Sequence, residues 1–194
     1  MDFVKQYFSE TTDIINSLNF KVINQIISNL KILRSSGGRL FFLGVGGSAA
    51  NASHAVNDFR KLCNIEAYAP TDNVSELSAR TNDEGWETVF SSWLETSKIC
   101  EKDALFILSV GGGNKEKNVS ANLVNAIDLA KLKKSKIFGI VGKSDGYTYN
   151  STDLCVHVPE VNSDRITPHS EAFQAVIWHC IVSHPSLQVN TTKW

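Results

Sequence analysis

Two short apolar runs, at residues 39–45 and 104–110, each end in glycines and lead into a segment with the spacing of a helix. The second run, ALFILSV, is almost continuously apolar, which is typical of a parallel strand buried on both faces. Such a strand needs helices on both sides of its sheet. The alternation of these runs with helical segments therefore predicts an α/β fold of three layers, with helices on either side of a parallel five-stranded sheet.

Apolar periodicity sets the expected limits of the elements. It predicts strands at residues 39–45, 65–69, 104–110, 137–141 and 154–158. Helices are expected from Ala49 onward and at residues 74–81, 86–100, 119–133 and 171–183, with a loop at 82–85. Residues 2–36 are expected to form a helical hairpin that is interrupted near Asn19. The high apolar content of this hairpin indicates either contact with another subunit or a plain covering role, and the pattern alone does not separate them.

The size and charge of the chain limit the classes of fold, partner and location to be expected. With 194 residues it is expected to form a single domain, residues 1–194, with a sizeable core. A net charge of -1 gives no electrostatic reason to expect nucleic acid or an anionic membrane as the main partner. The N-terminus does not read as a signal peptide, and no stretch approaches the roughly 18 apolar residues of a membrane span. Four scattered cysteines without a CxxC pair predict reduced thiols in a soluble, cytoplasmic protein.

The glycine turns are the first candidate for a binding site. Where a strand passes through glycines into a helix, backbone N–H groups point outward and can hold an anion such as phosphate. The first turn, residues 44–48, can also be spelled as a dinucleotide fingerprint, but Glu66 opens the next strand, whereas the ribose-binding acid should close it. A plain turn with Ser48 as the helix cap is the simplest alternative. Because the second turn, residues 109–114, should lie at the same sheet edge, the pair favours a small phosphorylated ligand.

Two helices carry side chains suited to metal binding or acid–base chemistry. His54 and Asp58 are four residues apart and therefore share one helix face. Glu171 and His179 are eight residues apart, close to two helical turns. Each pair alone has a structural explanation, as a surface pair or as a core histidine. Together they offer four ligands for a divalent metal, provided that the fold brings the helices together.

Five stretches occur in an order that resembles the SIS (sugar isomerase) domain family, in its phosphoheptose isomerase branch: GVGGSAANASHAVNDF, TNDEGWETVFSSWLE, ALFILSVGGG, FGIVGK and DRITPHSEAFQAVIWH. The resemblance implies an aldose–ketose isomerase that converts sedoheptulose 7-phosphate into D-glycero-D-manno-heptose 7-phosphate through an enediol. It also implies a homotetramer and a bound zinc or other divalent ion.

The resemblance assigns roles to individual residues. It implies metal binding by His54, Asp58, Glu171 and His179, and catalysis by Asp58 and His179. It implies that the substrate and its phosphate contact Gly46, Gly47, Ser48, Asn82, Asp83, Ser109, Gly111, Gly112, Asn114, Asp164 and Arg165.

Some positions depart from the family pattern. Asp58 replaces a glutamate, Glu171 replaces a glutamine, and the loop at 109–114 has lost two hydroxyls and is followed by an insertion that contains Lys115 and Lys117. These changes keep two alternatives open. One is an isomerase of a different sugar phosphate, and the other is a non-catalytic SIS protein that binds a phosphosugar or serves as a scaffold, for example with a replication initiator.

Overall fold

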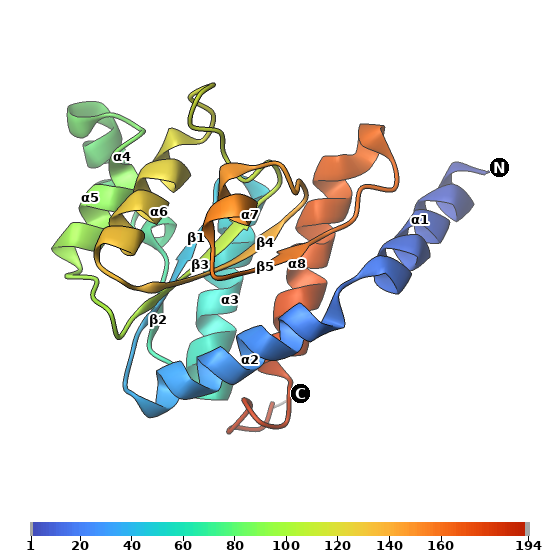
Figure 1. The fold of residues 1–194 in the computed structure, drawn as a ribbon, viewed down its shortest axis with the longest axis horizontal. Coiled ribbons are helices and arrows are strands. Elements are labelled where there is room, and N and C mark those ends of the chain that lie inside the picture. Colours follow the sequence, from blue (N-terminus) through green and yellow to red (C-terminus); the bar gives the residue numbers. More distant parts are fainter. Residues whose placement is uncertain (1, 193–194) are drawn as a thin grey trace.

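A five-stranded, all-parallel sheet forms the centre of the protein (Figure 1). The structure is a computed structural model and describes residues 2–192. The strand order is β2-β1-β3-β4-β5, and the strands are β1 (Leu40–Leu43), β2 (Ala67–Tyr68), β3 (Ala104–Ser109), β4 (Lys136–Val141) and β5 (Leu154–His157). Every residue of β1 and β3 is buried, as the continuous apolar runs predict. The predicted parallel five-stranded sheet is therefore confirmed.

Helices cover both faces of this sheet, which confirms the three layers. Leu40 and Phe42 of β1 point into one core, which they share with α2 (Phe20–Ser35), α3 (Gly47–Cys63) and α8 (Ile166–Val182). Phe41 and Leu43 point into the other core, against α5 (Val89–Thr96) and α6 (Ala121–Leu132). Successive side chains of β1 thus point to opposite faces of the sheet, and this one strand contributes to both cores. Helix α4 (Val74–Glu84) and the short helix α7 (Tyr147–Ser151) lie on the same side as α5 and α6 (Figure 1).

The N-terminal segment is the expected pair of helices, α1 (Phe3–Ser17) and α2. Asn19 interrupts it by accepting a hydrogen bond from the backbone N–H of Val22 at the start of α2. Helix α2 runs beneath the sheet, whereas α1 extends to the edge of the molecule (Figure 1). Within residues 2–192 no helix combines the length and the apolar character needed to cross a membrane.

Three predicted boundaries were wrong. Residues 82–84 are not a loop but the last turn of α4, which Arg80 stabilises by pairing with Glu76 at 2.9 Å and with Glu84 at 3.2 Å. Helix α8 begins at Ile166, five residues before the predicted start. Pro168 does not prevent this, because N–H groups in the first turn of a helix have no partner within the helix. Helix α5 is shorter than the predicted 86–100, and α7 was not predicted.

Candidate functional site

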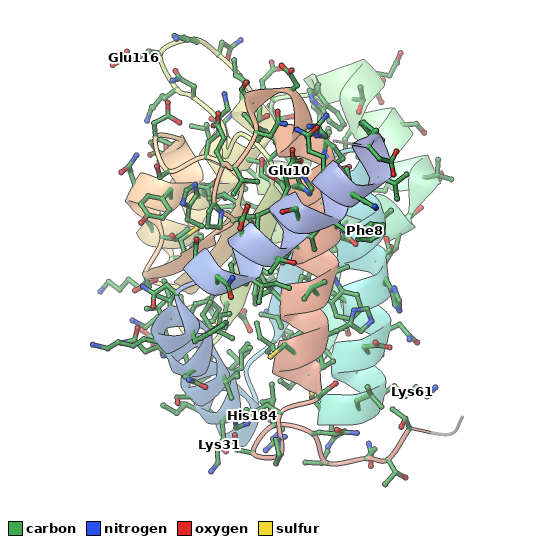
Figure 2. The ribbon with its side chains drawn as sticks, turned by 90° about the vertical axis from the view of Figure 1, so that its right-hand side faces the viewer. Phe8, Glu10, Lys31, Lys61, Glu116 and His184 are labelled. Carbon is green, nitrogen blue, oxygen red and sulfur yellow. The ribbon has the colours of Figure 1, made fainter. Side chains whose placement is uncertain are left out.

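Helices α3 and α8 form the platform of the candidate site. They lie side by side and run in the same direction (Figure 2). Between the start of α3 and the middle of α8, Gln174 Nε2 donates to the hydroxyl of Ser48 at 3.0 Å, and Asn51 Nδ2 donates to Gln174 Oε1 at 3.1 Å. Gln174 is fully buried, so these bonds fix the register of one helix against the other. Gln174 is not among the site residues predicted from the sequence, although a polar amide within the apolar run of α8 is itself a signal.

His54, Asp58 and His179 meet two turns further along the same two helices. The Nε2 atoms of His54 and His179 each lie 3.8 Å from Asp58 Oδ2. One donor atom from each of the three side chains lies within 4.8 Å of the others. The two imidazoles are about half exposed, whereas the Asp58 side chain is only 8% exposed. The fold therefore brings together three of the four side chains expected to bind metal.

The surroundings of this cluster set the direction of its donor atoms. His179 Nδ1 lies 2.8 Å from the carbonyl oxygen of Ala175. A carbonyl only accepts, so Nδ1 carries the proton and the lone pair of Nε2 faces Asp58. Asp58 Oδ1 accepts from Asn57 Nδ2 at 2.8 Å, which leaves Oδ2 toward the histidines. The ring of Trp178 stacks on that of His179, with centroids 3.5 Å apart, and holds its plane.

Two imidazole nitrogens and one carboxylate oxygen are a donor set that suits a divalent transition metal, zinc above all. Three protein ligands leave a coordination position for a substrate oxygen, as in catalytic rather than structural zinc sites. The donor chemistry of His54, Asp58 and His179 thus fits the expected metal.

Glu171, the fourth expected ligand, lies elsewhere. Its carboxylate is packed against Gly47, the first residue of α3, where a Cβ would stand 2.5 Å from Glu171 Oε2. Gly47 precedes His54 by seven residues, which is about 10 Å along a helix axis. Within the described part of the chain, Glu171 is therefore not part of the group formed by His54, Asp58 and His179.

The second glycine turn is held in shape by α7, the helix that was not predicted. The carbonyl of Gly112 accepts from both the N–H and the hydroxyl of Thr148, each at 2.8 Å, and the carbonyl of Gly113 accepts from the N–H of Tyr147 at 2.8 Å. The hydroxyl of Ser109 accepts from the N–H of Gly112 at 3.0 Å. Gly112 and Gly113 both have positive φ, 72° and 79°, which favours glycine at these positions.

Two asparagines lie on either side of the insertion that follows this turn. Asn114 pairs through its backbone with Val119, which closes the inserted residues into a loop. Asn122 lies in the first turn of α6 and is fully buried, and its Nδ2 has no hydrogen-bond partner within residues 2–192. An orphaned buried donor is costly unless a ligand or water satisfies it. Asn122 could not be singled out from the sequence, where it resembles an ordinary polar residue near a helix start.

The remaining expected substrate residues lie outside these two centres. Asn82 and Asp83 are exposed on α4 and bonded to each other at 2.7 Å. Asp164 is exposed in the short 3-10 helix η2 (Ser163–Arg165). The guanidinium of Arg165 is engaged by Glu10 of α1, with Nη2 to Oε1 at 2.8 Å.

Glu10 is the centre of a buried polar cluster that ties α1 to the start of α8. Besides Arg165, it accepts from Asn162 at 2.8 Å and lies 2.9 Å from His169 Nε2. Hydrogen bonds from Arg165 and then from His169 hold the pKa of Glu10 well below its ordinary value. In Figure 2, α1 crosses the upper part of α8, with Glu10 at the crossing.

The chain is similar to known proteins over most of its length. The sequence model described as SIS domain matches residues 6–142. A phosphoheptose isomerase of Rhodospirillum rubrum is 32% identical over 136 residues, which cover 68% of this chain and 69% of that protein. The lincomycin biosynthesis protein LmbN of Streptomyces lincolnensis is 31% identical over 160 residues, or 77% of this chain, which spans only 56% of LmbN.

A solved structure of a phosphoheptose isomerase from Francisella tularensis superposes with a TM-score of 0.79, covering 93% of this chain and 95% of that one. The sequence identity in that superposition is 22%, so the likeness concerns the fold.

Proposed function

The chain belongs to the SIS domain family, and on that premise we propose that it is a metal-dependent aldose–ketose isomerase of a phosphorylated sugar. Sedoheptulose 7-phosphate is the proposed substrate, and D-glycero-D-manno-heptose 7-phosphate is the product. The observation that carries the proposal is the convergence of His54, Asp58 and His179 from two helices. A chance surface pair would explain His54 and Asp58, but it would not explain the directed Nε2 of His179.

The proposed reaction moves protons and leaves the oxidation state of the whole sugar unchanged. Asp58 removes the proton from the carbon next to the carbonyl, which gives an enediol, and a proton is returned to the former carbonyl carbon. His179 is proposed to carry the proton that passes between the two oxygens, through Nε2, because its Nδ1 is bonded to the Ala175 carbonyl, and its Nε2 is then a weakly held ligand of the metal. A divalent ion held by His54, Asp58 and His179 polarises the carbonyl when it is bound. Since a tightly coordinated carboxylate is a poor base, Asp58 is proposed to be a weakly held ligand.

We place the phosphate of the substrate at the second glycine turn. The N–H groups of Gly111 and Gly113 are proposed to bind the phosphate, because the N–H of Gly112 donates to Ser109 and the carbonyls of Gly112 and Gly113 are bonded to α7. Ser109 and Asn114 lie in the turn, and Asn122, whose buried Nδ2 has no partner within residues 2–192, lies in the first turn of α6 beyond the insertion. The neighbouring α6 adds the partial positive charge of a helix N-terminus.

We further propose a cytoplasmic homotetramer. The apolar side chains of α1 support contact between subunits, since Phe3 and Phe8 are 61% and 65% exposed. All four cysteines are free thiols, as in a reducing compartment.

Zinc content and isomerase activity together test the proposal. The purified protein is expected to hold stoichiometric zinc and to convert sedoheptulose 7-phosphate. His54→Ala and His179→Ala should each lose the metal and the activity. His184→Ala is the matched control, because the half-buried imidazole of His184 bonds only to Ser186 within residues 2–192.

A non-catalytic phosphosugar-binding or scaffold protein is the second candidate. It is favoured by the position of Glu171 beside Gly47 and by the pairing of Arg165 with Glu10, which reduce the set of groups free for catalysis. Under this alternative, the protein binds sugar phosphate without converting it. The His54→Ala variant would then contain as much zinc as the wild-type protein.

A further inference from the structure

The N-terminus of α3 already has a carboxylate of the chain itself beside it. A Cβ on Gly47 would stand 2.5 Å from Glu171 Oε2 and 2.7 Å from Oε1, so only a glycine leaves room for this carboxylate. A helix N-terminus attracts anions, because its first N–H groups have no partner within the helix and the helix dipole is positive at that end. The carboxylate of Glu171 therefore lies beside a helix start that would otherwise favour an external anion.

The hydroxyl in the same turn is also engaged. Ser48 is 2% exposed and its Oγ accepts from Gln174 Nε2 at 3.0 Å. The other end of that amide is bonded to Asn51, so Gln174 has no freedom to release Ser48. Neither the partial positive charge at the N-terminus of α3 nor the hydroxyl of Ser48 is thus available to bind a phosphate.

We propose that Glu171 is a specificity-determining residue that excludes anionic groups from the first glycine turn. The inference rests on the proposed function and sharpens its substrate class. Strands β1 and β3 are neighbours in the sheet, so the turns that follow them lie next to each other. A sugar that binds through its phosphate at the second turn presents its other end toward α3. A second anionic group at that end meets the negative charge of Glu171.

The favoured ligand class is accordingly a sugar with one phosphate and an uncharged, hydroxylated end. Sugar bisphosphates and phosphorylated sugar acids are disfavoured. Hydroxyl groups at the uncharged end can donate to the Glu171 carboxylate, whereas a second phosphate cannot.

A titration of the full-length protein with inorganic phosphate tests this assignment. Binding is monitored by NMR, through the shifts of the backbone amide resonances. In the wild-type protein, phosphate should shift the amides of residues 111–113 and leave those of residues 47–49 unchanged. In Glu171→Ala, the amides of residues 47–49 should respond as well. They should do so at phosphate concentrations at least about tenfold lower than any at which they respond in wild type. Glu171→Gln, which removes the charge but keeps the bulk, should give a smaller gain. Glu101→Gln, at an exposed position before β3, is the matched control and should behave as wild type.

Two results would overturn the inference. One is a phosphate response at residues 47–49 in the wild-type protein, which would mean that Glu171 does not exclude anions. The other is the absence of such a response in Glu171→Ala, since the carboxylate would then not be the cause of exclusion. A missing response at residues 111–113 alone would instead contradict the proposed phosphate site, so the two failures are distinguishable.

Discussion

Glu10 illustrates how a single residue of α1 influences the helix that carries the candidate site. Its carboxylate is bonded to Arg165, His169 and Asn162, all in or just before the first turn of α8. The ring of Tyr7 packs on His169 with a centroid separation of 4.5 Å and closes the cluster from one side. The expected substrate contact of Arg165 is thereby replaced by an internal ion pair.

Replacing Glu10 by Gln should make the stability of the protein less dependent on pH. The pKa of Glu10 is lowered in the folded state by Arg165 and His169. Its charge therefore stabilises the fold above its ordinary pKa of 4.5, and this contribution is lost as the pH falls below that value toward the folded-state pKa. Thermal unfolding should show a deficit for Glu10→Gln at pH 7 that shrinks below pH 4.5.

The exposed Asp13→Asn on the same helix is the control, and its unfolding curve should follow that of wild type. An equal deficit for Glu10→Gln at every pH would mean that packing, and not charge, explains the role of Glu10.

At the scale of elements, the register between α3 and α8 determines whether His179 reaches Asp58. Both helices pack on the same face of the sheet, and the buried Gln174 is bonded to two residues of α3, Ser48 and Asn51. A shift of one residue would rotate His179 by about 100° and remove it from the group.

Gln174→Leu should disturb both stability and metal binding. The change leaves the buried hydroxyl of Ser48 without its partner and removes one of the two hydrogen bonds of Asn51 Nδ2, which also donates to the carbonyl of Glu171. A loss of about 1–3 kcal/mol in the free energy of unfolding is expected. Zinc affinity should fall as well, because His179 loses its fixed register. Urea unfolding and a zinc titration measure the two effects. Gln25→Leu, at an exposed position of α2, should stay within about 0.5 kcal/mol of wild type.

Thr148→Val tests the role of α7 in shaping the second glycine turn. The Thr148 side chain is fully buried and its hydroxyl donates to the carbonyl of Gly112. Valine keeps the shape but removes the donor, so a cost of about 1 kcal/mol and a weaker affinity for phosphate are expected. Thr71→Val is the control, because the buried hydroxyl of Thr71 has no partner in the described residues. Unchanged phosphate affinity in Thr148→Val would contradict the view that α7 maintains the turn.

At the scale of the whole molecule, the sequence predicted the architecture well and the arrangement of the site only in part. Buried parallel strands have a strong local pattern, so β1, β3 and β4 were found close to their observed limits. The meeting of His54 and Asp58 with His179 depends on how two distant helices pack, for which the sequence offered only the residue types. The position of Glu171 was not predictable, because it follows from the close approach of α8 to Gly47.

The exposed apolar face of α1 bears on the assembly of the molecule. Phe8 is 65% exposed, an unusual state for a phenylalanine unless it contacts another chain. Phe8→Asp should lower the mass measured by light scattering below that of the wild-type assembly, whereas Val119→Asp, on the exposed insertion, should not. A wild-type mass equal to one chain would contradict the proposed tetramer.

Proton exchange at the substrate tests the central claim most directly. Zinc-loaded protein is incubated with sedoheptulose 7-phosphate in deuterium oxide, and deuterium bound to carbon is measured in the sugar phosphate over time. The account predicts that wild type introduces deuterium next to the carbonyl as it forms the aldose, and that Asp58→Asn does so at least about a hundredfold more slowly. A wild-type rate no higher than that of Asp58→Asn, together with no conversion of any five- to seven-carbon sugar phosphate, would contradict it.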